Sequence, residues 1–306
     1  MRDVTTLFLL LTLAMGPGCP SSSPPAREAH PEPTAQPGTS PSPAQSPAPV
    51  LTPQDLTALL EKSAKQLDTS QDSISGADDA LEGWVNLAEI GEQLQAGLKG
   101  SGESPGEPAT TRGRVLTLTE TWGPLFDSLG TSSSQCESAD SVHFVALEVL
   151  TYAQESKQMQ ELDAALAGQT PRTLEQALDR LAAADRELEV ATGPTASGLA
   201  RAHVNAVKLG TVFKSWRSSE PESKARREAA AEIKRELQAI DTQITAAQAA
   251  TRTLGAAAKA HVKASLGLQG ELRTLALILA QWVESLGEAA PTELRAACER
   301  LRLEAH

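Results

Sequence analysis

The sequence is poor in aromatic residues and in positive charge. Aromatic residues make up 3% of its 306 residues, with four Phe, four Trp and one Tyr. This composition disfavours β-sandwiches and barrels, whose strands are rich in aromatic and β-branched residues. The 27 Lys and Arg against 39 Asp and Glu leave a formal charge of −12. A chain this acidic is a poor nucleic-acid binder, because binding requires basic residues that neutralise phosphates.

The chain also lacks the short motifs of common enzymes and metal sites. It contains no C-x-x-C, C-x-x-C-H, G-x-S-x-G, H-E-x-x-H, Walker loop or EF-hand spacing. No two of its five histidines share a helical turn, so helix-based zinc spacing is absent. Its single S/T-x-x-K match, Thr211 to Lys214, stands without a supporting motif. We therefore expect no enzyme activity, no cofactor and no metal site.

The first residues have the pattern of an export signal. Arg2 supplies a minimal positive region, and residues 4–15 carry no polar side chain except threonine. As a helix, residues 4–15 would rise only about 18 Å, against a bilayer hydrocarbon core of about 30 Å. The segment is therefore too short to span a membrane comfortably and has the length of a signal-peptide core.

Residues 13–19, Leu-Ala-Met-Gly-Pro-Gly-Cys, resemble the lipobox of bacterial lipoproteins. In that family the cysteine becomes the new N-terminus and carries a diacylglycerol thioether and an acylated amine. The resemblance implies that residues 1–18 are a signal peptide and that Cys19 is lipidated. Gly18 fits the family pattern, whereas Gly16 stands where the family has Leu and Pro17 also departs. The resemblance covers residues 1–19 only, and the alternative is a secreted or periplasmic protein in which Cys19 is incidental.

The segment after Cys19 has the composition of a tether. Residues 20–53 hold 11 of the 19 prolines, no aromatic residue, and only Val50 and Leu51 as large apolar side chains. Such a segment cannot bury enough apolar surface to offset its ordering entropy. We expect residues 19–52 to be a lipidated cysteine followed by a disordered, Pro-rich linker, extended at about 3.1 Å per residue.

The lipoprotein resemblance also bears on location. In that family, Asp after the cysteine retains many proteins at the inner membrane of enteric bacteria, and this chain has Pro20 there. The resemblance thus implies a cell-envelope protein anchored by lipid, with the outer membrane favoured if the host has one.

From residue 53 onward, apolar residues recur at steps of three and four, the period of amphipathic helices. We predict an all-α domain over 53–306, an antiparallel bundle with long coiled-coil-like helices and a sub-boundary near 100–113 or 218. Thr52 as N-cap and Pro53 at the first helical position predict where the first helix begins. Further helices are expected over 114–129, 139–167, 171–193 and 196–217, with Pro124 kinking or ending the first of these and loops over 100–113 and 130–138.

The last third has the most regular pattern. Apolar and small residues keep a strict spacing of four and three from Ile233 to Leu286, which favours left-handed supercoiling. The spacing continues across Gly267 and Gly270 and therefore favours a continuous or merely kinked helix over a hairpin there. A final helix is expected over 292–304. Ser219 and Glu222 predict a capping box at the start of the long helix that carries this stripe. We expect this stripe to be bundle core; the alternative is a homo-oligomer formed through helices in 219–289.

Three further groups are weak site candidates. If Cys19 carries lipid, Cys136 and Cys298 are the right number for one disulfide in an oxidising compartment; the alternative is two free thiols. Residues 53–107 contain 11 acidic and 3 basic residues, which gives this segment a net charge of −8. We expect these charges to form a face exposed to solvent. Within that segment the weak cation candidates are Asp78, Asp79 and Glu82. Helical bundles that bind haem use Met and His ligands from facing helices. The residues of these types near predicted helix–helix contacts are His143, Met159, His203 and His261.

The function favoured by the sequence is that of a lipid-anchored cell-envelope protein with a structural or protein-interaction role through helical surfaces. Its membrane contact would be the N-terminal lipid, and its protein partner is not identified by the sequence. The alternative is a helical bundle that binds haem, a metal or an apolar small molecule.

Overall fold

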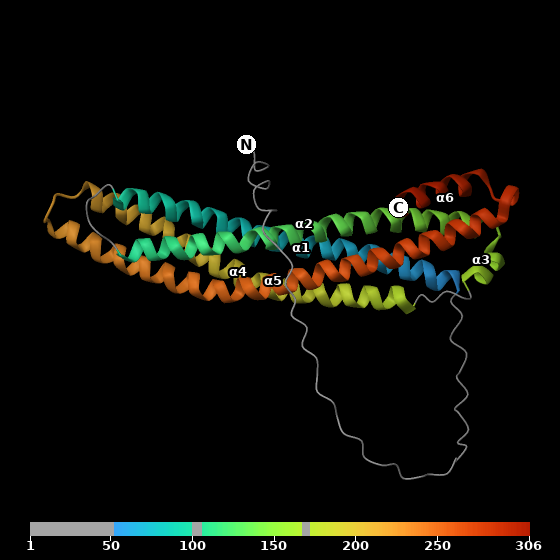
Figure 1. Ribbon diagram of the computed structural model, residues 1–306, viewed down its shortest axis with the longest axis horizontal. Coiled ribbons are helices and arrows are strands. Elements are labelled where there is room, and N and C mark those ends of the chain that lie inside the picture. The colour runs from blue at the N-terminus through green and yellow to red at the C-terminus, as the bar shows by residue number, and fades with distance from the viewer. Residues whose placement is uncertain (1–51, 100–105, 167–171) are drawn as a thin grey trace, which may run out of the picture. The chain divides into compact units, whose positions relative to one another are not determined.

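The computed structural model describes residues 52–99, 106–166 and 172–306, and the regular structure in these ranges is entirely helical (Figure 1). The predicted all-α fold is confirmed. The predicted signal peptide, Cys19 and the Pro-rich linker lie outside the described residues. The helices are α1 (Pro53–Lys99), α2 (Gly106–Glu155), α3 (Met159–Leu166), α4 (Arg172–Ser218), α5 (Lys224–Leu286), the 3₁₀ turn η3 (Gly287–Ala289) and α6 (Thr292–Ala305).

The four long helices form two antiparallel hairpins that pack face to face. Hairpin α1–α2 lies on hairpin α4–α5, with α1 beside α4 and α2 beside α5. Cross-helix pairs such as Lys62–Asp179 and Ser70–Asp185 show that α1 and α4 run parallel. Ser132–His261 and Ser138–Gln269 show the same for α2 and α5. Chain neighbours are therefore antiparallel, as predicted, and the order of the helices in space is α1, α2, α5, α4.

Helix α1 begins where the sequence predicts. The Thr52 hydroxyl accepts from the Asp55 amide at 3.3 Å, and the Asp55 carboxylate accepts from the Thr52 amide at 3.0 Å. The Thr52 hydroxyl also donates to the Asp55 carboxylate at 2.7 Å. The two hydrogen bonds that this carboxylate accepts lower the pKa of Asp55, the bond from the Thr52 hydroxyl more than the bond from the Thr52 amide. Reciprocal bonds of this kind satisfy donors that the first helical turn leaves unpaired.

Helix α2 corrects several predictions. It is continuous from Gly106 to Glu155, so the predicted loop over 130–138 is wrong. The predicted loop over 100–113 is helical from Gly106 onward, and Pro124 does not end the helix. The physical reason is core burial: Leu129, Cys136 and Ala139 are fully buried at helical spacing, and their packing outweighs the local Gly and Ser content. The predicted helix over 139–167 is interrupted after Glu155, and α3 begins at Met159.

Helix α4 also continues through a predicted stop. Gly193 and Pro194 lie inside it, although the sequence predicts an end there. Ala191, Thr195 and Leu199 are buried on either side of the proline, so the apolar face continues without a break. Residue 171, where this helix is expected to begin, lies outside the described residues.

Helix α5 confirms the prediction of one continuous helix across Gly267 and Gly270. Its apolar stripe is buried within the bundle, which confirms the expectation that it is core. Its N-cap is Ser223, whose hydroxyl accepts from the Arg226 amide at 3.1 Å. The predicted capping box is wrong, because the Ser219 hydroxyl donates instead to the Ser215 carbonyl.

The chain turns back after α5 and ends in the short helix α6, which packs on the outside of the four long helices. Gly287, at φ 55°, closes α5 with a backbone conformation that suits glycine. Helix α6 then packs on both α2 and α5, and Arg300 pairs with Glu148 of α2. Within the described ranges, no helix combines the length and apolarity that crossing a bilayer requires.

Candidate functional site

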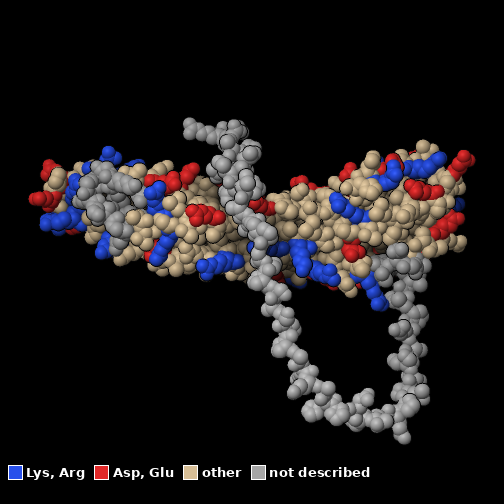
Figure 2. All heavy atoms as spheres, viewed as in Figure 1, with Lys and Arg blue, Asp and Glu red and all other residues tan. Residues whose placement is uncertain are grey.

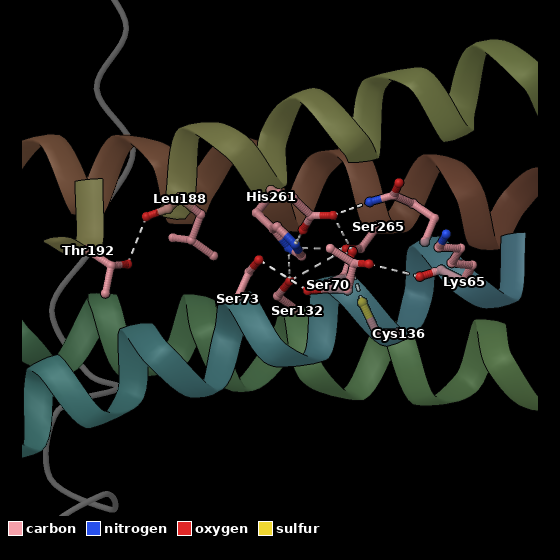
Figure 3. A network of polar contacts seen from close by, with 12 residues as sticks. Lys65, Ser70, Ser73, Ser132, Cys136, Leu188, Thr192, His261 and Ser265 are labelled. Atoms are coloured by element: carbon pink, nitrogen blue, oxygen red, sulfur yellow. Dashed lines mark hydrogen bonds and ion pairs between the residues drawn. The ribbon is translucent and has the colours of Figure 1, made fainter. Parts of the chain in front are cut away.

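All four long helices contribute polar side chains to one buried layer in the middle of the bundle (Figure 3). The contributors are Ser70 and Gln66 from α1, Ser132 from α2, Asp185 from α4 and His261 from α5. Ser70, Ser132 and His261 have no exposed surface, and Asp185 is 4% exposed. This layer is the largest group of mutually bonded polar side chains in the described core.

The carboxylate of Asp185 is the hub of the layer. Its Oδ1 lies 2.7 Å from His261 Nε2, and its Oδ2 accepts from the Ser70 hydroxyl at 2.8 Å and from the Gln66 amide. A carboxylate only accepts hydrogen bonds, so Nε2 of His261 carries a hydrogen. A buried carboxylate with three donors is compensated, whereas one without donors would cost several kcal/mol.

The other ring nitrogen of His261 faces α2. Its Nδ1 contacts the hydroxyls of Ser132 and, at 3.3 Å, of Ser265. The Cys136 thiol lies 3.6 Å from the Ser265 hydroxyl. Burial, more than any other cause, raises the pKa of Cys136 to about 11, so this thiol is protonated at neutral pH. Hydroxyls and a thiol thus complete the layer on the side opposite Asp185.

The chain of contacts from Asp185 through His261 to Ser132 has the order of a nucleophilic Ser–His–Asp system. In this structure, however, the Ser132 hydroxyl and the imidazole are fully buried among helices, so a substrate has no contact with them. What the arrangement does is hold four helices at one axial register, because a shift of any helix would break bonds to buried groups.

Sequence reasoning missed three members of this layer, which are Gln66, Asp185 and Ser132. Asp185 stands between Leu181 and Leu188 on the buried face of α4, so an acid at a core position was the available signal. Ser132 was placed in a predicted loop. His261 and Ser265 fall on the stripe that is predicted from Ile233 to Leu286. The same spacing of four and three, counted from Leu56, places Ser70 on the apolar face of the first predicted helix.

The structure does not bring the candidate haem ligands together. His261 is bonded within the polar layer, and His143 is buried on α2 with neither ring nitrogen hydrogen-bonded. His203 is exposed on α4, and Met159 begins the separate helix α3. Across 52–99, 106–166 and 172–306, no three His, Cys, Asp or Glu side chains are grouped to hold a metal ion.

The remaining polar candidates lie at the surface. Asp78, Asp79 and Glu82 are exposed on α1. The pKa of Asp78 is raised by partial desolvation and, to a smaller extent, by the neighbouring Asp79 carboxylate. The Thr211 hydroxyl donates to the Val207 carbonyl of its own helix at 3.3 Å.

Cys136 and Cys298 are both free and buried. Cys136 contacts Ser265, whereas the Cys298 thiol on α6 lies 4.0 Å from the Leu279 carbonyl. Ser265 and Leu279 are about 21 Å apart along α5 at 1.5 Å per residue. The structure therefore does not bring the two cysteines of the predicted disulfide together.

An apolar cavity lies between the four long helices near the α4–α5 turn. Its lining includes Leu87, Ile90, Leu209, Phe213 and Ile240, and its volume is about 40 Å³. Small-molecule sites usually enclose about 300–1,000 Å³. The cavity is thus a packing gap rather than a formed ligand site.

Replacing Asp185 by Ala should lower the free energy of unfolding by about 3–5 kcal/mol, because His261, Ser70 and Gln66 would lose their common acceptor in the core. Urea denaturation followed by circular dichroism measures this loss. The control is Asp179→Ala on the same helix, an exposed carboxylate 3.6 Å from Lys62, which should change stability by less than about 1 kcal/mol. Equal effects of the two substitutions would contradict the role of the layer.

His143 should make the protein less stable in mild acid. Burial lowers its pKa from 6.5 to about 4, so the unfolded chain binds a proton more readily between these values. Stability should therefore fall as the pH drops from 6.5 to 4, by about 3 kcal/mol in all. His143→Leu should remove this part of the pH dependence, whereas His203→Leu, at an exposed position, should keep it. Identical pH profiles for wild type and His143→Leu would refute the prediction.

Cys136 and Cys298 should resist alkylation in the native protein, because both thiols are buried and burial raises the pKa of each to about 11. Both should react fully in denaturant without a reductant. Peptide mass spectrometry after iodoacetamide treatment reads each site separately from Cys19. A disulfide-linked peptide containing both residues would show instead that the two pair.

Comparison of the chain with protein-family models, with curated proteins and with solved structures found no match. The inferences that follow therefore rest on this chain's own residues.

Proposed function

We propose that this chain is a lipid-anchored protein of a bacterial cell envelope that acts as a structural or protein-interaction module through its helical surfaces. The tether and the lipid would hold the bundle near a membrane, and the helices would present the binding faces. The lipid anchor is supported by the lipobox-like sequence ending at Cys19.

The interaction role is supported by how the polar groups are distributed. The side chains best suited to chemistry, Asp185, His261 and Ser132, are fully engaged with one another in the core. These groups hold the four helices in register, and long helical faces remain exposed at the surface. This contrast is the observation that carries the proposal.

The outer face of α4 is an example of such a surface. Val190 is 73% exposed, Val204 is 64% exposed and Val207 is 54% exposed. Single exposed apolar residues are common, but a partner that covers several on one helix gains about 25 cal/mol per Å² of buried apolar area. Faces of this kind suit a protein that works by contact.

The anchor is tested with a Cys19→Ser variant expressed in a bacterium that lipidates exported proteins. Two or more acyl chains hold a protein firmly at a membrane, so the wild type should incorporate labelled palmitate and enter the detergent phase of Triton X-114. The variant should lose both properties. Cys136→Ser and Cys298→Ser are the matched controls and should keep both. A Cys19→Ser protein that still enters the detergent phase would refute lipidation at this residue.

A further inference from the structure

An open groove runs between α2 and α5 in the part of the bundle that precedes the polar layer along both helices. Its volume is about 400 Å³. The residues that matter for what it binds are Thr117, Thr121 and Ser128 on α2 and Arg252, Gly255 and Lys259 on α5. Its lining spans residues 117–128 and 248–259, so it is about 17 Å long at 1.5 Å per residue. We call it the α2/α5 groove.

Helix α6 occupies the same pair of helices farther along. It packs on both α2 and α5, and its Cys298 lies against Leu279. In that region Ala276, Ala280 and Val283 of α5 are buried.

These buried α5 positions repeat the groove positions Gln248, Arg252 and Gly255 four heptads later. On α2, Val142 and Val149 are buried three heptads after Thr121 and Ser128. Residues that share a heptad position lie on the same face of a supercoiled helix. The fold therefore already seats one helix on this face, and the α2/α5 groove is the stretch of the face that α6 leaves open.

The walls of the groove allow a helix to approach closely. Gly255 has no side chain, and a Cβ there would lie 3.6 Å from Leu125, in ordinary contact. Ala256, Thr117 and Thr121 are also small. The distance between packed helices is 8–10 Å and depends on the side chains at the contact, so small walls permit the shorter end of this range.

The positive charge of the groove favours a docked helix that carries acidic side chains. Arg252 and Lys259 are exposed and lie one heptad apart on α5. Neither has an ion-pair partner among the described residues, and no acidic residue lines the groove. Figure 2 shows Lys and Arg side chains gathered near the middle of the bundle on the face that includes α5. Two unpaired cations beside an apolar floor complement an apolar stripe flanked by carboxylates.

We propose that an acidic amphipathic helix of a partner protein docks in the α2/α5 groove, with small apolar residues on its floor and Asp or Glu beside Arg252 and Lys259. Recognition of this kind reads anchors at i, i+3, i+4 and i+7 of the bound helix. The inference rests on the proposed function as an interaction protein, and it names the site and the chemistry of the partner.

The test uses a synthetic 14-residue helical peptide, the length of α6, with Ala and Leu at i, i+3, i+4 and i+7 and Glu on both flanks. The control peptide has Lys in place of every Glu. Fluorescence anisotropy with the full mature protein should detect binding of the acidic peptide only, weakening as salt increases. Arg252→Glu combined with Lys259→Glu should weaken binding by about tenfold or more. The charge-matched control, Lys214→Glu with Arg217→Glu on α4, should leave binding unchanged.

A second variant tests the groove by shape rather than charge. Ala256 is an exposed lining residue, so Ala256→Trp should fill the groove, keep the thermal midpoint and abolish peptide binding. Ala200→Trp, at an exposed position on α4, is the matched control and should bind normally. Equal binding of both peptides, or binding insensitive to the groove variants, would overturn the inference. So would a dimer that Ala256→Trp dissociates, because a second copy would then fill the groove.

Photo-crosslinking in the native cells separates this inference from the proposed function. A crosslinking amino acid is placed at position 121 in the groove or at position 204 on α4. Crosslinks from position 204 to an envelope protein, with none from position 121, would overturn the groove site and leave the interaction role standing. An absence of crosslinks from both positions would overturn both.

Discussion

Asp185 and His261 lie on different helices, and both are buried so deeply that they need hydrogen-bond partners inside the core. They contact each other at 2.7 Å, and the other side chains of the polar layer supply the remaining partners. A carboxylate without donors in this core would cost several kcal/mol, which is a large fraction of the stability of a typical domain. Ser70 and Ser132 extend the same requirement to α1 and α2. Apolar side chains alone would tolerate sliding of one helix past another by a heptad. The polar layer removes that freedom because its bonds form in one alignment only.

The helical class, the start of α1 and the continuity of α5 could be predicted because each depends on local pattern. Thr52 and Asp55 form a cap within four residues, and the spacing across Gly267 and Gly270 never changes phase. Predictions failed where local composition opposed packing. Gly193 with Pro194, and the Gly/Ser-rich segment after Leu129, resemble stops, yet the buried residues around them continue the helix. Contacts with distant helices decide these positions, and a single sequence does not display them.

The polar layer could be predicted only in part, for the same reason. His261, Ser265 and Ser70 stand out as polar residues on apolar stripes, but which of them meet depends on α1 lying parallel to α4 and α2 parallel to α5. Cys136 and Cys298 show the converse case. Their number suggested a pair, whereas α5 holds one beside Ser265 and the other beside Leu279. The open face beside Arg252 was equally invisible, because it depends on where α6 ends.

The polar layer also couples the lengths of the four helices. Because the layer fixes one point along each helix, the number of residues between it and either end of the bundle must match between neighbours. An insertion of seven residues in α4 between Asp185 and the turn after Ser218 would keep the apolar face but leave α5 one heptad short of that turn. The bundle can therefore be lengthened only by insertions of equal length in neighbouring helices, made on the same side of the polar layer.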